Sequence, residues 1–173
     1  KLNVGASEYK PGAATYIEND LILNWYPKRI LKHLKGSGAR SLLKLGVGHG
    51  FTAQLFHQYF DRHVILEASS VVIDLFYERN HDDIEVVHTF FEKFETDEKF
   101  DVILMGFVLE HVDDPGLIVK RFKQNLAPEG RIFIAVPNAK SLNRRLGLKL
   151  GMINDIYKLN ANDHALGHQR QFC

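Results

Sequence analysis

Short apolar runs alternate with amphipathic stretches through the middle of this chain. Each run lacks the apolar–polar alternation of a strand with one wet face, which indicates strands buried on both faces. The runs are residues 41–45, 63–66, 84–87, 100–105 and 131–136, and the helical stretches are 21–34, 51–60, 70–79 and 115–125. We therefore expect an α/β fold: a Rossmann-like, doubly wound, mainly parallel sheet of about five strands with helices on both faces.

The two ends of the chain are less regular. Residues 1–20 are predicted to form an irregular arm, and Pro27 inside the first helical stretch predicts a helix that starts near it or two short helices. After the fifth run, loop and helix are expected around 142–150 and 154–159. Within one domain, we expect an N-terminal arm and helix (1–38), a cofactor-binding α/β core (39–138) and a C-terminal helical and loop segment (139–173).

Composition excludes several classes of function. The 22 Lys and Arg residues nearly balance the 21 Asp and Glu residues, and a net charge of +1 makes a nucleic-acid partner unlikely. The one cysteine, Cys173, cannot form an internal disulfide, and no apolar run is long enough to span a membrane. We expect a cytoplasmic protein without a membrane partner, with a homo-oligomer as one possible state.

A glycine loop follows the first predicted strand. Read from Gly46, the pattern Gly46-x-Gly48-x-Gly50 suits an adenosyl ligand without a phosphate, and Glu67, after the second strand, is placed to accept both ribose hydroxyls. Read from Gly48, the pattern also meets the dinucleotide fingerprint, but it leaves Gly46 inside the strand. A tight turn that binds no ligand is the remaining interpretation.

The segment 100–115, FDVILMGFVLEHVDDP, resembles a known family when taken together with the glycine loop. It is similar to the class I S-adenosylmethionine-dependent methyltransferases, in particular the group with a VLEHV-D-P segment after the fourth strand. The resemblance covers about residues 40–138, and Gly167-His168 with Arg170 is similar to a segment that some members carry further on. The resemblance implies S-adenosylmethionine as cofactor.

The resemblance also implies which residues bind the donor: the glycine loop at its methionine half, Glu67 at its ribose, and the ends of the third and fourth strands around its adenine and sulfonium. These residues are Leu45, Gly46, Val47, Gly48, Gly50, Glu67, Ala68, Thr89, Phe90, Phe91, Gly106 and Phe107. Phe90, Phe91 and Phe94 are interpreted first as core and second as an adenine wall.

Two departures from the family pattern bear on activity. Lys44 stands where these methyltransferases usually carry an acid, and a cation about 4 Å from the donor would repel it by about 1–4 kcal/mol unless the side chain snorkels away. The family usually completes seven strands with a pair after the fifth, which is missing here. We expect a C-terminally truncated, five-stranded sheet whose open edge is covered by 140–159 or by a second copy.

Glu110 and His111 are the catalytic candidates, because ligands of open α/β sheets gather past the ends of the strands. His111 is the favoured base, since an unperturbed pKa of about 6.5 suits proton removal near neutrality. The alternative is that both residues brace the following helix.

No metal is expected. Some methyltransferases bind a divalent metal through Glu-x-x-Glu-His, but Phe107 replaces the first acid here. His164 and His168 are spaced to face one way on a helix but lack a third ligand.

Asn138, Arg144 and Arg145 are the substrate candidates. These arginines are interpreted first as a solvated helix face near the substrate mouth. Because paired arginines recognise phosphate or carboxylate, the second interpretation is a small-molecule acceptor that is phosphorylated or nucleotide-linked. The expected function is methyl transfer to an oxygen or nitrogen of a small-molecule acceptor. The alternatives are a catalytically silent binding or assembly module and, more weakly, an NAD(P)-dependent oxidoreductase.

Overall fold

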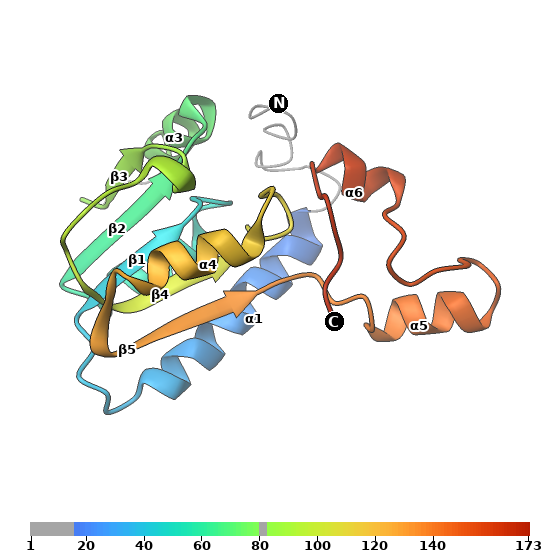
Figure 1. Ribbon diagram of the computed structural model, residues 1–173, viewed down its shortest axis with the longest axis horizontal. Helices are drawn as coiled ribbons and strands as arrows, with labels where there is room; N and C mark the ends of the chain where they lie inside the picture. Colours follow the sequence, from blue (N-terminus) through green and yellow to red (C-terminus); the bar gives the residue numbers. More distant parts are fainter. Residues whose placement is uncertain (1–15, 80–82) are drawn as a thin grey trace.

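The computed structural model describes residues 16–79 and 83–173, and it contains one parallel sheet with the strand order β3-β2-β1-β4-β5 (Figure 1). The strands are β1 (Ser41–Leu45), β2 (Arg62–Glu67), β3 (Glu85–His88), β4 (Phe100–Gly106) and β5 (Leu126–Ala135). Each neighbouring pair runs parallel, so the predicted five-stranded Rossmann-like fold is confirmed.

Helices lie on both faces of the sheet and beyond its carboxyl edge. They are α1 (Tyr16–Leu34), α2 (Phe51–His57), α3 (Ser70–Tyr77), α4 (Pro115–Lys123), α5 (Leu142–Lys149) and α6 (Ala161–Ala165), with one 3₁₀ turn at Phe91–Lys93. Asp114 caps α4 by accepting a hydrogen bond from the Leu117 amide.

Two helix predictions were wrong. α1 runs unbroken through Pro27 and begins at Tyr16, whereas we expected an arm to residue 20 and a break at the proline; the rest of that arm lies outside the described residues. Packing of Ile30 against the sheet compensates for the hydrogen bond that Pro27 cannot make. Residues 154–159 form turns and bends, and the last helix is α6, which a capping box between Asn160 and Asp163 starts.

The core explains why the strands lack polar alternation. Leu43 and Leu45 of β1 pack on the face covered by α4, while Leu42, on the other face, joins a cluster with Ile30 of α1 and Phe56 of α2. Side chains alternate along a strand, so Lys44 belongs to the same face as Leu42. Both faces of the central strands are therefore buried.

The carboxyl ends of all five strands lie at one edge of the sheet, and the segment after β5 extends beyond that edge (Figure 1). α5 lies past the end of β5 and not along its side, so the expectation that residues 140–159 cover the open edge was wrong. In the part of the chain that the structure describes, no helix is long and apolar enough to cross a membrane.

The central strands should carry most of the folding energy. Leu104 of β4 is fully buried, and Leu104→Ala should lower the free energy of unfolding by about 2–5 kcal/mol through lost burial and a cavity. Leu142 is 81% exposed on α5, and Leu142→Ala should change it by less than about 0.5 kcal/mol. Urea unfolding followed by circular dichroism measures both, and equal losses would contradict the assignment of the core.

Candidate functional site

The glycine loop connects β1 to α2 and requires glycine at three positions. Gly46, Gly48 and Gly50 have φ angles of 77°, 62° and 85°, which side chains with a Cβ rarely adopt. A Cβ at Gly46 would stand 3.0 Å from Val108, whereas one at Gly48 would meet open space. The loop thus leaves bare backbone facing space at Gly48, with the N-terminus of α2 behind it.

Glu67, at the end of β2, holds this loop in place. One carboxylate oxygen accepts a hydrogen bond from the Val47 amide at 3.1 Å, and the other accepts from the amides of Ala68 and Ser69 at 2.9 Å. The predicted neighbours Leu45, Gly46 and Val47 therefore meet Glu67 and Ala68 at the junction of β1 and β2.

Lys44 of β1 also contacts the glycine loop. Its side chain is 3% exposed, and its ammonium donates to the carbonyl oxygens of Gly46 and, at 3.1 Å, Val47. Burial lowers the pKa of Lys44 to about 8, and the negative charge of Glu67 opposes the shift. The Lys44 side chain therefore does not snorkel to solvent, because its ammonium is hydrogen-bonded to the carbonyl oxygens of the loop.

His63 shares the buried environment of Lys44. It is 5% exposed in β2, and neither ring nitrogen has a partner among the described residues. Burial lowers the pKa of His63 to about 3, and the positive charges of Lys44 and His57 add to the shift. The imidazole is therefore neutral at physiological pH.

Strain marks the end of β4, where Gly106 and Phe107 were predicted to face the donor. Phe107 has a φ of 56°, the one positive value among non-glycine residues that the structure describes, and such a conformation costs about 1–3 kcal/mol. Tyr26 of α1 packs edge-on against Phe107, and its hydroxyl oxygen would lie 2.5 Å from a Cβ at Gly106. Burial raises the pKa of Tyr26 to about 12, with a hydrogen bond to Thr52 opposing the shift. Nothing in the sequence pattern singled out Tyr26.

The turn after β3 completes the opposite side of the site. The Thr89 amide donates to the Glu67 carbonyl oxygen at 2.9 Å, which brings Thr89 beside the end of β2. Phe91 and Phe94 pack against the core, as first interpreted, whereas Phe90 is 43% exposed. Phe90 is thus the most exposed of the three aromatic side chains, and the Lys93 ammonium lies over its ring, 5.4 Å from the centroid.

Glu110 and His111 lie just past β4 on the α4 side. Glu110 is fully buried, its burial raises its pKa to about 7, and neither carboxylate oxygen has a hydrogen-bond partner among the described residues. The His111 ring meets the His168 ring edge-on at 4.9 Å between centroids. Surrounding protein and the positive charge of His168 lower the pKa of His111, although the residue has an exposed side.

The C-terminal strap, residues 167–172, binds back onto the loop that carries these two residues. The Gln169 amide donates to the Glu110 carbonyl oxygen at 2.8 Å, and the Gln169 side chain donates to the His111 carbonyl oxygen at 2.8 Å. The Arg170 guanidinium donates to the carbonyl oxygens of Leu109, Val112 and Asp113. The strap therefore fixes the backbone at Glu110 and His111.

The substrate candidates lie in the same C-terminal region, but they do not form one cluster of free cations. Asn138 bridges to Phe172 of the strap. Arg144 donates to the carbonyl oxygens of Ile156 and Lys158 and lies 3.9 Å from Asp163, so its guanidinium braces the chain after α5. Arg145 is exposed.

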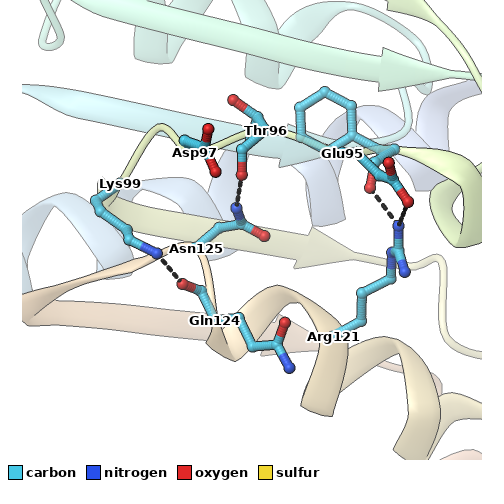
Figure 2. A pocket seen from close by; sticks show the side chains of 8 residues that line it. Glu95, Thr96, Asp97, Lys99, Arg121, Gln124 and Asn125 are labelled. Atoms are coloured by element: carbon cyan, nitrogen blue, oxygen red, sulfur yellow. Dashed lines mark hydrogen bonds and ion pairs between the residues drawn. The ribbon is translucent and has the colours of Figure 1, made fainter.

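A polar cavity of about 560 Å³ lies at the other end of the sheet, between the start of β4 and the end of α4 (Figure 2). Several of its polar groups bond to one another: Asn125 donates to the Thr96 carbonyl oxygen, Lys99 to that of Gln124, and Arg121 lies 3.8 Å from Glu95. Ligands of open α/β sheets bind at the carboxyl ends of the strands. The candidate site is therefore the glycine-loop edge.

Comparisons with known proteins bear on the family and the fold of the chain. A family model described as a methyltransferase domain matches residues 20–168. The N-methyltransferase NodS from Bradyrhizobium japonicum WM9, solved with S-adenosyl-l-homocysteine, has 22% identity and a TM-score of 0.60, over 70% of this chain and 65% of NodS. DhpI, also solved with S-adenosyl-l-homocysteine, has 21% identity and a TM-score of 0.61, over 79% of this chain and 66% of DhpI.

A third similar structure is the plantazolicin methyltransferase BpumL in complex with S-adenosyl-l-homocysteine, with 18% identity and a TM-score of 0.64. The match covers 83% of this chain and 55% of BpumL, so this chain spans about half of that protein. At such identities the likeness concerns the fold. A comparison with the curated proteins found no match.

The buried His63 should make the protein sensitive to acid. Its pKa is about 3 in the fold against 6.5 when unperturbed, so the unfolded chain takes up a proton first as the pH falls below 6.5. The neutral form of His63 makes its full contribution to the free energy of unfolding above pH 6.5, and this contribution is lost as the pH falls toward 3. Between pH 7 and pH 5 the free energy of unfolding should decrease by about 2 kcal/mol. His63→Leu should remove this loss, as measured by urea unfolding at both pH values. His33→Leu, at an exposed position of α1, is the control, and equal pH sensitivity of the two variants would contradict the assignment.

Proposed function

The chain belongs to the methyltransferase domain family, and from this premise we propose that it transfers a methyl group from S-adenosylmethionine to an oxygen or nitrogen of a small-molecule acceptor. The observation that carries the proposal is the glycine loop at the carboxyl edge of the sheet, with Glu67 bonded to Val47 and open space at Gly48. A loop without side chains beside a fixed carboxylate suits an adenosyl ligand that carries no phosphate.

The glycine loop and the end of β2 would bind neighbouring parts of the donor. Gly46, Gly48 and Gly50, with Leu45 and Val47, would line its methionine half, and Glu67, with Ala68, would hold the ribose hydroxyls. Bound there, the donor supplies a methyl group that is already activated for displacement. The protein then has to align the acceptor and exclude water.

The other side of the donor site is formed by the ends of β3 and β4. Thr89 and the exposed ring of Phe90 would flank the adenine, with Phe91 packed behind them. Gly106 and the strained Phe107 would face the sulfonium, with Tyr26 covering this side from α1. The backbone of Phe107 is in a strained conformation, and strained residues are often found at functional sites.

Glu110 and His111 are the proposed catalytic residues. A lowered pKa keeps the His111 imidazole neutral near pH 7, the form that accepts a proton from a hydroxyl or ammonium acceptor. The strap fixes their backbone, and the hydrogen bond from Gln169 to Glu110 is part of that restraint. For the acceptor, exposed Arg145 and Asn138 are the proposed contacts, with Arg144 acting from its braced position; a phosphate or nucleotide group on the acceptor would use this basic region.

A catalytically silent binding module is the second candidate, and Lys44 is the observation that favours it. A cation stands at the end of β1 where the resembling methyltransferases usually have an acid. Transfer of labelled methyl groups from S-adenosylmethionine to any small-molecule fraction would reject the silent module. The nicotinamide alternative receives no support from the family match.

Donor binding can be tested at Gly48 with a matched control. Gly48→Ala and Gly36→Ala both add a Cβ to left-handed backbone, and neither Cβ meets another atom within 4 Å. Only Gly48 lies on the proposed donor site, so Gly48→Ala should weaken S-adenosylhomocysteine binding by about tenfold or more in isothermal titration, equivalent to about 1.4 kcal/mol. Gly36→Ala should bind as the parent does. Absence of binding by the parent at millimolar concentration would reject the donor assignment.

The hydrogen bonds of Lys44 lead to a second prediction. Replacing Lys44 by an acid should weaken donor binding, whereas charge repulsion alone would predict tighter binding. If its ammonium repelled the donor, Lys44→Met and then Lys44→Glu would bind S-adenosylhomocysteine progressively more tightly. Because the ammonium bonds the carbonyl oxygens of Gly46 and Val47, a carboxylate there would face two acceptors and disturb the loop. We expect Lys44→Glu to bind at least about fivefold more weakly than the parent, with Lys44→Met between them. Tighter binding by Lys44→Glu would overturn this account.

A further inference from the structure

We propose that Glu110, His111 and His168 form a binding site for a divalent transition-metal ion. One ligand atom from each of these residues lies within 4.8 Å of the other two. An ion with bonds of about 2.0–2.2 Å holds its ligand atoms about 3–4 Å apart. Side-chain rotations that move the three ligand atoms by about an ångström would therefore bring them within bonding distance of one ion. Two imidazole nitrogens and one carboxylate oxygen are a donor set that Zn²⁺ and its first-row neighbours accept.

The carboxylate of Glu110 is the observation that points to a ligand. Its side chain is fully buried, and apart from the backbone amide of Glu110 itself, neither oxygen has a hydrogen-bond partner on any described residue. Buried carboxylates are normally paired or coordinate a metal, because leaving one without a partner is costly. Arg170, the one arginine or lysine of the strap, gives its hydrogen bonds to backbone carbonyl oxygens and to Gln169. A bound dication would supply the missing partner.

The two histidines are already oriented as ligands. Nδ1 of His168 lies 3.1 Å from a carboxylate oxygen of Asp163, which leaves Nε2 for a metal. The His111 ring makes a hydrogen bond to the backbone of Gly167. Metal-ligating histidines usually bond a carboxylate or a carbonyl through their second nitrogen, which fixes the ring and the tautomer.

Asp163 is itself held rigidly. It is 9% exposed, it accepts hydrogen bonds from the Asn160 amide at 2.9 Å and from the Gln171 side chain at 3.2 Å, and it lies 3.9 Å from Arg144. The chain thus provides a supporting layer behind His168 before any ion is bound. This layer explains why Arg144 is turned inward, away from solvent.

The sequence argued against a metal because Phe107 replaces an acid and because His164 and His168 lacked a third ligand. α6 ends at Ala165, so these two histidines do not share a helix face, and the strap carries His168 to Glu110 and His111 instead. The site is assembled from residues 57 and 58 positions apart, which no local spacing could indicate.

Three protein ligands leave at least one coordination position open. At this edge of the sheet, such a position could take an oxygen of the acceptor and polarise it; this extension rests on the proposed function, whereas the metal site itself does not. With the ion bound, His111 serves as a ligand and not as the base.

The test uses the full chain with Cys173→Ser as background, since an exposed thiol could bind metal on its own. After chelator treatment and dialysis, isothermal titration with Zn²⁺ and with Mg²⁺ measures affinity, and Co²⁺ in place of Zn²⁺ gives a visible absorption spectrum. We expect one Zn²⁺ per chain with a Kd below about 10 µM and weak Mg²⁺ binding.

Variants locate the site. Glu110→Gln and His168→Ala should each weaken Zn²⁺ binding by about tenfold or more, and Asp163→Asn by about 10–100-fold, because it loses the support behind His168. His164→Ala, on exposed α6, is the matched control and should bind as the background does. Glu110→Gln keeps the shape of the side chain and removes its charge, so it remains informative if His168→Ala unfolds.

Four results would overturn the proposal: no Zn²⁺ binding at about 100 µM, Mg²⁺ bound more tightly than Zn²⁺, unchanged affinity in Glu110→Gln, or an equal loss in His164→Ala. Titration of the same variants with S-adenosylhomocysteine reports on the glycine loop alone. Failure of the metal site and failure of the donor site are therefore distinguishable.

Discussion

Burial of β1 and β4 on both faces is the constraint on which the rest of the structure depends. Because these strands have no wet face, polar groups within them must find partners at their ends. Lys44 does so by reaching the carbonyl oxygens of Gly46 and Val47, while Glu67 takes the Val47 amide from the neighbouring strand. The glycine loop is thus held between a cation and an anion, and its open side at Gly48 is presented to a ligand.

The same constraint decided what could be predicted from the sequence. Uninterrupted apolar runs, the glycines after β1 and the acid after β2 are local patterns, so the strands, the loop and Glu67 were placed correctly. The direction of Lys44 and the contact of Tyr26 with Phe107 depend on which elements pack together, and no spacing encodes that. α1 passes through Pro27 for a related reason, since tertiary packing outweighs local propensity.

The two faces of the sheet bury ionisable groups of opposite sign: a lysine on one face and a glutamate on the other. On the face covered by α2, Lys44 is buried with His63 near it, and the pair is tolerated because the imidazole stays neutral. On the face covered by α4, Glu110 is a buried acid without a hydrogen-bond partner on any other residue that the structure describes. Each face therefore buries an ionisable group close to the carboxyl edge, where strain at Phe107 also accumulates. Groups with perturbed pKa values and strained backbone gather at functional sites, so their coincidence here marks that edge.

The C-terminal segment consequently belongs to the site and is more than an appendage to it. Folding 139–173 as a detached arm would leave the loop around Glu110 without the hydrogen bonds of Gln169 and Arg170, and it would remove His168 from His111. Asp163 starts α6 through its capping box with Asn160, and its contacts with Arg144 and Gln171 also hold the carboxylate that orients His168. A buried carboxylate fixes the orientation of His168, which faces a second histidine beside an acid that has no ion-pair partner among the described residues. A shared ion explains this arrangement more simply than packing does, because packing alone would be served better by apolar side chains.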